Sequence, residues 1–385
     1  MKSNYKQLGQ YIRQVDVRNT EGKEDNLLGV SVQKKFIPSI ANTVGTDFTK
    51  YKVVKKGQFT YIPDTSRRGD KIGIALLEDY EEGIVSNAYT VFEIIDDNQL
   101  IPEYLMLWFN RPEFDRYARF KSHGSVREIM DWEEMCKVEL PVPSIGEQKR
   151  IVNNYKAITD RIALKKQIND NLEAQLLCLF NQFFGDIIKQ KSELPDNWIK
   201  AEAQTIFDIS IGKTPPRERL DCFTNNPTDV PWVSISDMGI NGTYILQTSE
   251  NLTKEAIKEF NVKLVPKNTV IYSFKMTNGR TSITTEECTT NEAIAHFKTD
   301  NYSLTLYAYC YLSCFRFSDL GSTSSITEAV NSKIIKAMNF FIPPQDELES
   351  FVSVAKPIFE NIKYNSVELI KLNVLASDYL ALLSR

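Results

Sequence analysis

The chain has 385 residues and a formal net charge of -4, with 42% hydrophobic and 25% charged residues. This composition is typical of a globular protein, and the length suffices for two or three domains with separate cores. The chain contains no apolar run of the roughly 18 residues that a transmembrane helix needs. The N-terminal stretch MKSNYKQLGQYIRQ is too polar for a secretory signal. We therefore expect a cytoplasmic protein with no transmembrane helix.

The charges are unevenly distributed along the chain. Residues 34–71 carry nine basic and three acidic residues, whereas residues 78–97 carry seven acidic residues and no basic one. Residues 254–280 carry six basic and two acidic residues. Each basic cluster is either a solvated surface or a local binding face for nucleic acid, because phosphate contacts need lysine and arginine. The net charge of -4, taken alone, argues mildly against binding of nucleic acid.

The first globular region is predicted over residues 1–145, where the short β-like runs VVKKGQFTYI and KIGIALL accompany the helical stretch PEYLMLWFNRPEFDRYARF. A long helix is predicted over residues 146–186, because apolar residues recur there every three or four positions, as in a coiled coil. Its seam residues are Ile151, Ile158, Ile162, Leu172, Leu176 and Leu179.

The same layout is then repeated, with a second globular region over residues 187–343 and a second long helix over residues 344–385. Lys165 and Asn365 interrupt the two apolar stripes at positions 200 residues apart, and a polar seam residue can fix the register of a helix pair. Pro357 is expected to kink the second helix or to remove one of its hydrogen bonds. The seam residues of this helix are Phe351, Ile358, Ile362, Leu369, Leu372 and Leu383.

Each predicted helix has about 38 residues and a length of about 57 Å. An exposed apolar stripe of that length needs a partner, and the other copy within the chain is the simplest one. Packing onto a globular domain or onto another chain are the alternatives. The fold class is therefore α+β, with two mixed α/β domains, two long helices in an antiparallel coiled coil, and a pseudo-twofold internal repeat.

No catalytic or metal-binding signature is present. The chain lacks a GxxxxGK[ST] phosphate loop, a GxGxxG loop, a GxSxG elbow and an HExxH helix. His123 and His296 are the only histidines, and His296 alternates with apolar residues, which is typical of a core position. The six cysteines form no CxxC pair, and Cys310 and Cys314 are expected on a buried helix face. We expect no catalytic residue and no metal site.

Several elements together resemble the DNA-specificity (S) subunits of type I restriction–modification systems. These are the duplicated domain–helix layout, the Pro-x-Pro turn leading into GEQKRIV, the heptad helices, and the IGKTP…VPWVSISDM opening of the second domain. The resemblance covers essentially the whole chain. Two departures occur: the second turn reads QDELESFV, and the first domain lacks the GKTP opening. Both imply that the two domains read different DNA sequences.

The resemblance implies a non-catalytic subunit. Each domain would be a target-recognition domain for one half of a split site in double-stranded DNA, and the antiparallel helices would set the spacer. Two modification subunits would dock on the chain, bind S-adenosylmethionine and methylate adenine at N6. Restriction subunits would join them to translocate and cut unmethylated DNA. No cofactor is expected on this chain itself.

Residues that read or hold DNA are expected in polar loops rich in Arg, Lys, Asn and Ser. For the first domain the candidates are Lys34, Lys35, Ser66, Arg67, Arg68 and Lys71. For the second domain they are Lys213, Lys275, Thr277, Asn278 and Arg280. A further set follows matched glycines and comprises Ser125, Arg127, Ser322 and Ser324. The segments TSRRGDK and TNGRTS align between the domains, each just after a predicted strand.

One alternative belongs to a different class, a non-enzymatic scaffold with two protein-binding modules on a coiled-coil spacer. It explains the duplication and the near-neutral charge. It does not explain why basic loops recur at the same aligned position. A strong salt dependence of DNA binding would separate the two interpretations.

Overall fold

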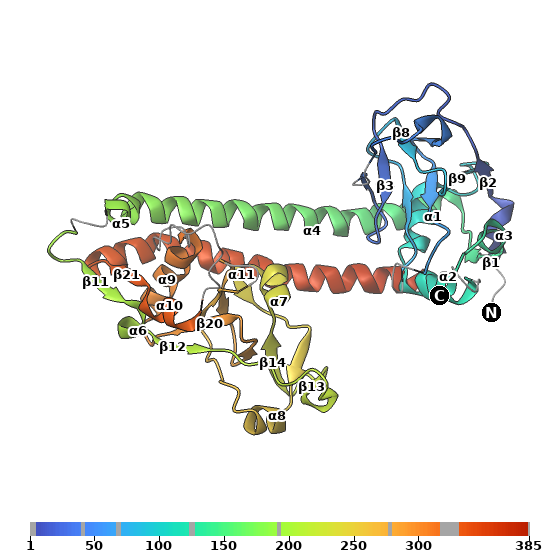
Figure 1. The fold of residues 1–385 in the computed structure, drawn as a ribbon. Helices are drawn as coiled ribbons and strands as arrows, with labels where there is room; N and C mark the ends of the chain where they lie inside the picture. Colours follow the sequence, from blue (N-terminus) through green and yellow to red (C-terminus); the bar gives the residue numbers. More distant parts are fainter. Residues whose placement is uncertain are drawn as a thin grey trace. The chain divides into compact units, whose positions relative to one another are not determined.

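The computed structural model describes residues 5–39, 43–66, 71–122, 128–190, 194–275, 279–315 and 331–383 (Figure 1). The chain forms two compact units: unit 1 comprises Met1–Ile162 and Leu372–Arg385, and unit 2 comprises Ala163–Lys371. None of the helices in the described ranges is long and apolar enough to cross a membrane.

Unit 1 is built around a four-stranded antiparallel sheet with the strand order β2-β9-β6-β7. Its strands are β2 (Ile12–Val15), β6 (Phe59–Tyr61), β7 (Ile74–Leu76) and β9 (Thr90–Ile94). Three two-stranded sheets accompany it: β1 (Tyr5–Gln7) with β10 (Glu139–Pro141), β3 (Leu28–Val30) with β4 (Phe36–Pro38), and β5 (Lys52–Lys55) with β8 (Glu82–Val85). The short helices are η1 (Leu8–Gln10), η2 (Phe48–Lys50), α1 (Pro102–Phe109), α2 (Pro112–Lys121) and α3 (Trp132–Cys136).

Unit 2 contains a five-stranded sheet with the order β12-β20-β17-β18-β15. Its strands are β12 (Asp208–Ile211), β15 (Tyr244–Ile245), β17 (Val270–Ser273), β18 (Thr281–Thr284) and β20 (Ile294–Lys298). A second sheet holds β13 (Phe223–Thr224), β14 (Val230–Val233), β16 (Glu250–Leu252) and β19 (Thr289–Thr290), and β11 (Ile199–Glu202) pairs with β21 (Asn339–Ile342). The short helices are a π-helical turn (Asn181–Gly185), η4 (Leu220–Cys222), α5 (Asp186–Gln190), α6 (Ala203–Ile206), α7 (Ile235–Asn241), α8 (Lys254–Glu259), α9 (Tyr302–Cys314) and α10 (Ser332–Ala337).

The two units repeat one topology, which confirms the predicted internal repeat. The order β2-β9-β6-β7 in unit 1 matches β12-β20-β17-β18 in unit 2, and the neighbouring strands are antiparallel in both. In each unit the strand that precedes the long helix pairs with the first strand of the unit: β10 with β1, and β21 with β11. The common frame therefore brings each β-hairpin loop, β6–β7 or β17–β18, to the same place in its sheet.

The long helices are α4 (Ile145–Phe180) and α11 (Gln345–Leu382). Within unit 2 they run side by side and antiparallel, because Lys165 lies near Asn365 whereas Phe180 packs on Phe351 with ring centroids 5.9 Å apart (Figure 1). The Lys165 ammonium donates to the Asn365 side chain at 2.7 Å and forms an ion pair with Glu368 at 2.8 Å. The two polar seam positions predicted from the sequence therefore meet in one polar layer.

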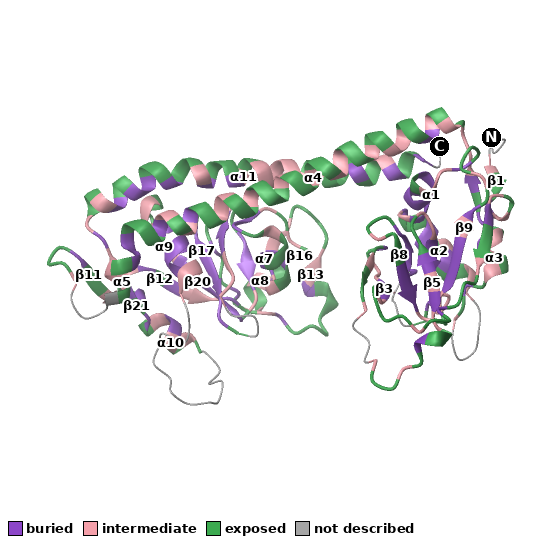
Figure 2. Cartoon of the chain, turned by 90° about the horizontal axis from the view of Figure 1, so that it is seen from above, coloured by how far each residue is buried: buried purple, intermediate pink, exposed green. Residues whose placement is uncertain are grey.

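The residues of the predicted apolar seam are buried or half-buried along both helices. In Figure 2, buried and half-buried positions alternate with exposed ones along α4 and α11. Phe359 was missed, although it is fully buried and packs on Tyr309 with centroids 5.4 Å apart, whereas its neighbour Ile358 is half-buried. The helix α11 continues through Pro357, an exposed residue, without interruption. Heptad spacing did not find the aromatic residue on which α9 packs.

Candidate nucleic-acid interface

The two candidate loops of unit 1 share a common base. The Thr65 amide and hydroxyl both donate to the Glu128 carbonyl, at 2.9 and 3.1 Å, and the Met130 amide donates to the Pro63 carbonyl at 3.0 Å. The start of the β6–β7 loop, at residues 63–65, therefore lies beside residues 128–130. Sequence reasoning had placed these loops in two separate sets. The candidates Arg67, Arg68, Ser125 and Arg127 lie outside the described residues.

Three described candidates of unit 1 face solvent. Lys35 and Lys71 are exposed, as phosphate contacts require. Ser66 is exposed too, and its amide and hydroxyl donate to the Asp64 carboxylate at 3.0 and 2.6 Å. These bonds form a turn at residues 64–66.

Lys34 is placed differently from its neighbours. Its side chain is only 5% exposed, its ammonium forms an ion pair with Asp115 at 2.9 Å, and it also donates to the Phe109 carbonyl. Burial lowers the pKa of this ammonium, although the Asp115 carboxylate opposes that effect. Because the Lys34 ammonium is buried with these two partners, we do not expect it to contact DNA.

In unit 2 the GKTP turn is packed tightly against the sheet. The Lys213 amide donates to the Thr290 carbonyl at 2.9 Å, and the Gly212 amide donates to the Ile294 carbonyl at 3.0 Å. A Cβ atom on Gly212 would lie 2.0 Å from the Asn291 carbonyl oxygen, so only glycine fits here. The turn leaves the Lys213 side chain exposed, as its proposed role requires.

His296 lies in the core below this turn, as predicted. Its Nδ1 is 2.8 Å from the Ser210 hydroxyl and its Nε2 is 2.7 Å from the Thr290 hydroxyl. Burial lowers the pKa of His296 to about 3. The ring is therefore neutral in the folded protein and supports the turn through two hydroxyl groups.

We expect acid to destabilise unit 2 through His296. The folded pKa of about 3 lies below the ordinary value of 6.5, so the unfolded chain binds the extra proton first as the pH falls. The stabilisation is complete above pH 6.5 and is lost between pH 6.5 and about 3, at up to about 1.4 kcal/mol per pH unit. Urea unfolding midpoints at pH 7 and pH 5 test this, with His296→Gln as a control that cannot titrate. Equal losses in the parent and the control would contradict it.

Arg217, which was not among the sequence candidates, lies against two aromatic rings that pack edge to face, with centroids 5.6 Å apart. Its guanidinium carbon is 4.1 Å from the centroid of Phe223 and 4.5 Å from that of Trp232, and it pairs with Glu250 at 2.8 Å. The side chain is half exposed, so one edge remains accessible. This contact is only weakly indicated by the sequence, because Phe223 and Trp232 are not adjacent to Arg217. They occur later in the chain, in PPRERLDCF and DVPWV.

The β17–β18 loop of unit 2 contains the remaining described candidates. Arg280 donates from its amide to the Ser273 hydroxyl at 3.0 Å and from Nη1 to the Ile235 carbonyl at 2.5 Å. That carbonyl lies at the start of α7, where Ser234 and Asp237 form a capping box. Lys275 is exposed. The candidates Thr277, Asn278, Ser322 and Ser324 lie outside the described residues.

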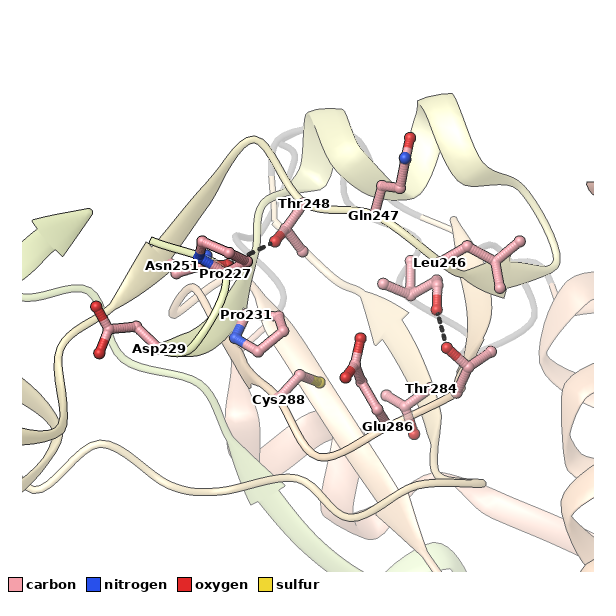
Figure 3. Close-up of a pocket in the computed structure, with 12 residues that line it drawn as sticks. Pro227, Asp229, Pro231, Leu246, Gln247, Thr248, Asn251, Thr284, Glu286 and Cys288 are labelled. Carbon is pink, nitrogen blue, oxygen red and sulfur yellow. Dashed lines mark hydrogen bonds between the residues drawn. The ribbon is translucent and has the colours of Figure 1, made fainter. Parts of the chain in front are cut away.

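A cavity of about 420 Å³ opens between the two sheets of unit 2 (Figure 3). Its charged lining residues, Asp229 and Glu286, are both acidic, and Cys288 also lines it. Such a lining does not suit a phosphate group. Within the described ranges no group of three or more His, Cys, Asp or Glu residues is placed to hold a metal ion.

Comparison with known proteins agrees with this arrangement. Residues 3–174 and 195–372 each match the family model of the type I restriction modification DNA specificity domain. The chain belongs to this family. The two matched segments each contain one globular region and most of one long helix, so the specificity domain is present twice. The family supports a general role in DNA recognition.

Named relatives belong to the same specificity family. The chain is 25% identical over 299 residues to the type I restriction enzyme MjaIX specificity subunit of Methanocaldococcus jannaschii, covering 72% of this chain and 67% of that protein. It is 22% identical over 389 residues to the HindI specificity subunit of Haemophilus influenzae, covering 82% and 83%. A type I restriction–modification S subunit from M. genitalium has a similar fold, with a TM-score of 0.55 at 12% identity, over 99% of this chain and 96% of that one.

Proposed function

We propose that the chain is the specificity subunit of a type I restriction–modification complex and reads a DNA site made of two separate halves. The globular part of each unit reads one half. The observation that carries this proposal is the repeated sheet, which presents a β-hairpin loop bearing lysine or arginine at the same topological position twice. Because the loops differ in sequence and anchoring, the two halves differ in their bases.

The long helices set the gap between the halves in this proposal. At 1.5 Å per residue, the 36 residues of α4 extend about 54 Å. That length is comparable to the spacing of half-sites on one face of DNA, about 34 Å or a multiple. A paired seam with a polar layer at Lys165 keeps the helix pair in one register.

Chemistry is supplied by partner subunits in this proposal. Two modification subunits dock on the chain, bind S-adenosylmethionine, and flip and methylate adenine at N6. They also provide part of the positive surface that holds the phosphate backbone, which reconciles DNA binding with a net charge of -4. Restriction subunits join the same complex. The chain itself binds no cofactor and catalyses no step.

A methylome is the direct test. The chain is co-expressed with its modification subunit, and N6-methyladenine is mapped by long-read sequencing with and without the chain. Two short defined sequences around a fixed gap, lost on deleting the chain, are the expected result. Methylation that persists unchanged without the chain, with an active modification subunit, would reject the proposal. DNA binding without salt dependence would favour the protein-binding scaffold instead.

We expect Arg280→Ala to lower the methylation of target sites by about tenfold or more. The reason is weaker recognition of the half-site that unit 2 reads, because the β17–β18 loop loses its anchor at α7. The loss of the bond to the Ile235 carbonyl should cost the fold only about 1–2 kcal/mol. The two effects are separated by methylome sequencing and urea unfolding of the complex. Lys263→Ala, an exposed change in the same unit, is the matched control. Equal methylation in both variants would contradict the expected role.

A further inference from the structure

The β6–β7 loop of unit 1 is held at both ends by one helix. The Ile62 amide donates to the Gly73 carbonyl at 2.8 Å, which closes the neck of the loop. At the C-terminal end the Ile72 amide donates to the Asp115 carboxylate at 3.2 Å. At the N-terminal end Arg119 donates to the Thr65 carbonyl at 3.5 Å. Asp115 and Arg119 are four residues apart on α2 and therefore share one face of that helix.

The Asp115 carboxylate is itself fixed in place. It is 11% exposed and forms the ion pair with Lys34 at 2.9 Å. Lys34 belongs to the turn between β3 and β4, where its backbone adopts a positive φ of 60° and its amide donates to the Ser31 carbonyl. One buried carboxylate thus connects the turn at residues 31–35 with residues 71–73 at the end of the β6–β7 loop, and these two segments carry the exposed cations Lys35 and Lys71.

A buried ion pair is a costly way to stabilise a fold, because apolar residues of similar size commonly do as well. The presence of a buried ion pair is better explained when the pair holds a neighbouring backbone segment in one conformation. In the described part of the equivalent loop of unit 2, the Arg280 amide bonds the Ser273 hydroxyl, and the Gly279 amide bonds the Ser273 carbonyl at 2.9 Å. The bond from the Ile72 amide to Asp115 lies in unit 1, so the inference is made for the half-site of unit 1.

We propose that Asp115 is a positioning residue for sequence readout: held by Lys34, its carboxylate fixes the backbone at Ile72 beside the exposed Lys71, and so determines which bases unit 1 accepts. This inference rests on the proposed function. Asp115 does not contact DNA, and it acts through the backbone of Ile72. Loss of its oxygen frees the C-terminal end of the loop, and more than one base then fits opposite it.

Two double variants separate positioning from stability. Lys34→Met with Asp115→Asn keeps a side-chain oxygen that accepts from the Ile72 amide, whereas Lys34→Met with Asp115→Leu removes it. Both replace the buried ion pair with uncharged residues, which is expected to preserve folding. Glu113→Gln, a change at an exposed carboxylate on the same helix, is the control for charge loss. Each variant is co-expressed with the modification subunit, and the methylome and the thermal unfolding midpoint of the complex are measured.

The leucine variant is expected to lose discrimination at one or more positions of the unit 1 half-site by about fivefold or more, the cost of a typical mismatch. The gap and the other half-site should be unchanged, and the asparagine variant and Glu113→Gln should keep the parental motif. A leucine variant that folds and keeps the parental motif would overturn this inference but not the proposed function. Equal loss of base discrimination in both half-sites would do the same. A leucine variant that fails to fold while the asparagine variant folds would also overturn it, because the oxygen would then serve stability. A parent methylome that does not depend on the chain would reject the proposed function itself.

Discussion

Inserting one heptad into each long helix, after Ile162 and after Lys371, should lengthen the gap of the methylated site while leaving the bases of both halves unchanged. Seven residues add about 10 Å to each helix, which is the rise of about three base pairs. A whole heptad keeps the apolar stripe on one face of each helix, so the seams on either side of the insertion stay paired. A gap longer by one to about three base pairs is expected, and the methylome measures it.

An insertion in α4 alone is the informative counterpart. Placed after Ile162, it shifts the unit 1 part of α4 along α11 and moves Tyr155 away from Tyr379, whose ring centroid lies 6.3 Å from that of Tyr155. We expect loss of methylation and a lower unfolding midpoint for this variant, because the two seams no longer match. If the double insertion kept the parental gap, the helices would not set the spacing of the site.

Replacing Phe351 by alanine should cost about 3–5 kcal/mol of unfolding free energy, as for other large side chains in a core. Phe351 is fully buried and packs edge-on against three rings, at centroid distances of 5.9 Å for Phe180, 5.7 Å for Phe183 and 5.3 Å for Phe184. This cluster joins the two long helices within unit 2. Removing one ring leaves a cavity that the neighbouring rings cannot fill without changing their packing.

Urea unfolding of the purified complex measures this loss. Val354→Ala on the same helix is the matched control, because that side chain is 49% exposed and its truncation should cost well under about 1 kcal/mol. A Phe351→Ala variant as stable as the control would mean that the aromatic cluster does not hold the helix pair together.

The repeat and the long helices were predictable from the sequence, because they depend on short-range spacing. Apolar residues at every third or fourth position specify which face of a helix is buried, whatever it packs against. The core position of His296 followed from the same kind of evidence, an alternation of two along a strand. The polar layer was likewise visible as Lys165 and Asn365, although the third member, Glu368, was not.

The candidate site was predicted less well, because it depends on contacts between distant residues. Lys34 and Lys35 are adjacent and chemically identical, yet one is buried against Asp115, 81 residues further along the chain, and the other is exposed. Nothing local distinguishes them. Arg217 was missed for the same reason, since its partners Phe223 and Trp232 approach only when β13 and β14 join one sheet. Charge counts identify a region, and tertiary pairing selects the residues within it.

The polar layer also discriminates between partners for each long helix. Positions 165 and 168 of α4 correspond to positions 365 and 368 of α11, 200 residues further along the chain. If α4 paired with α4 of a second chain, Lys165 would meet Lys165 and Ile168 of that chain in place of Asn365 and Glu368. Two ammonium groups would then face one another in a half-buried seam, with no acceptor and no carboxylate from the partner. The seam therefore favours pairing within one chain over exchange between identical chains. A fragment of residues 1–180, which ends with α4, should accordingly remain a monomer at concentrations where the Lys165→Asn variant of the same fragment self-associates.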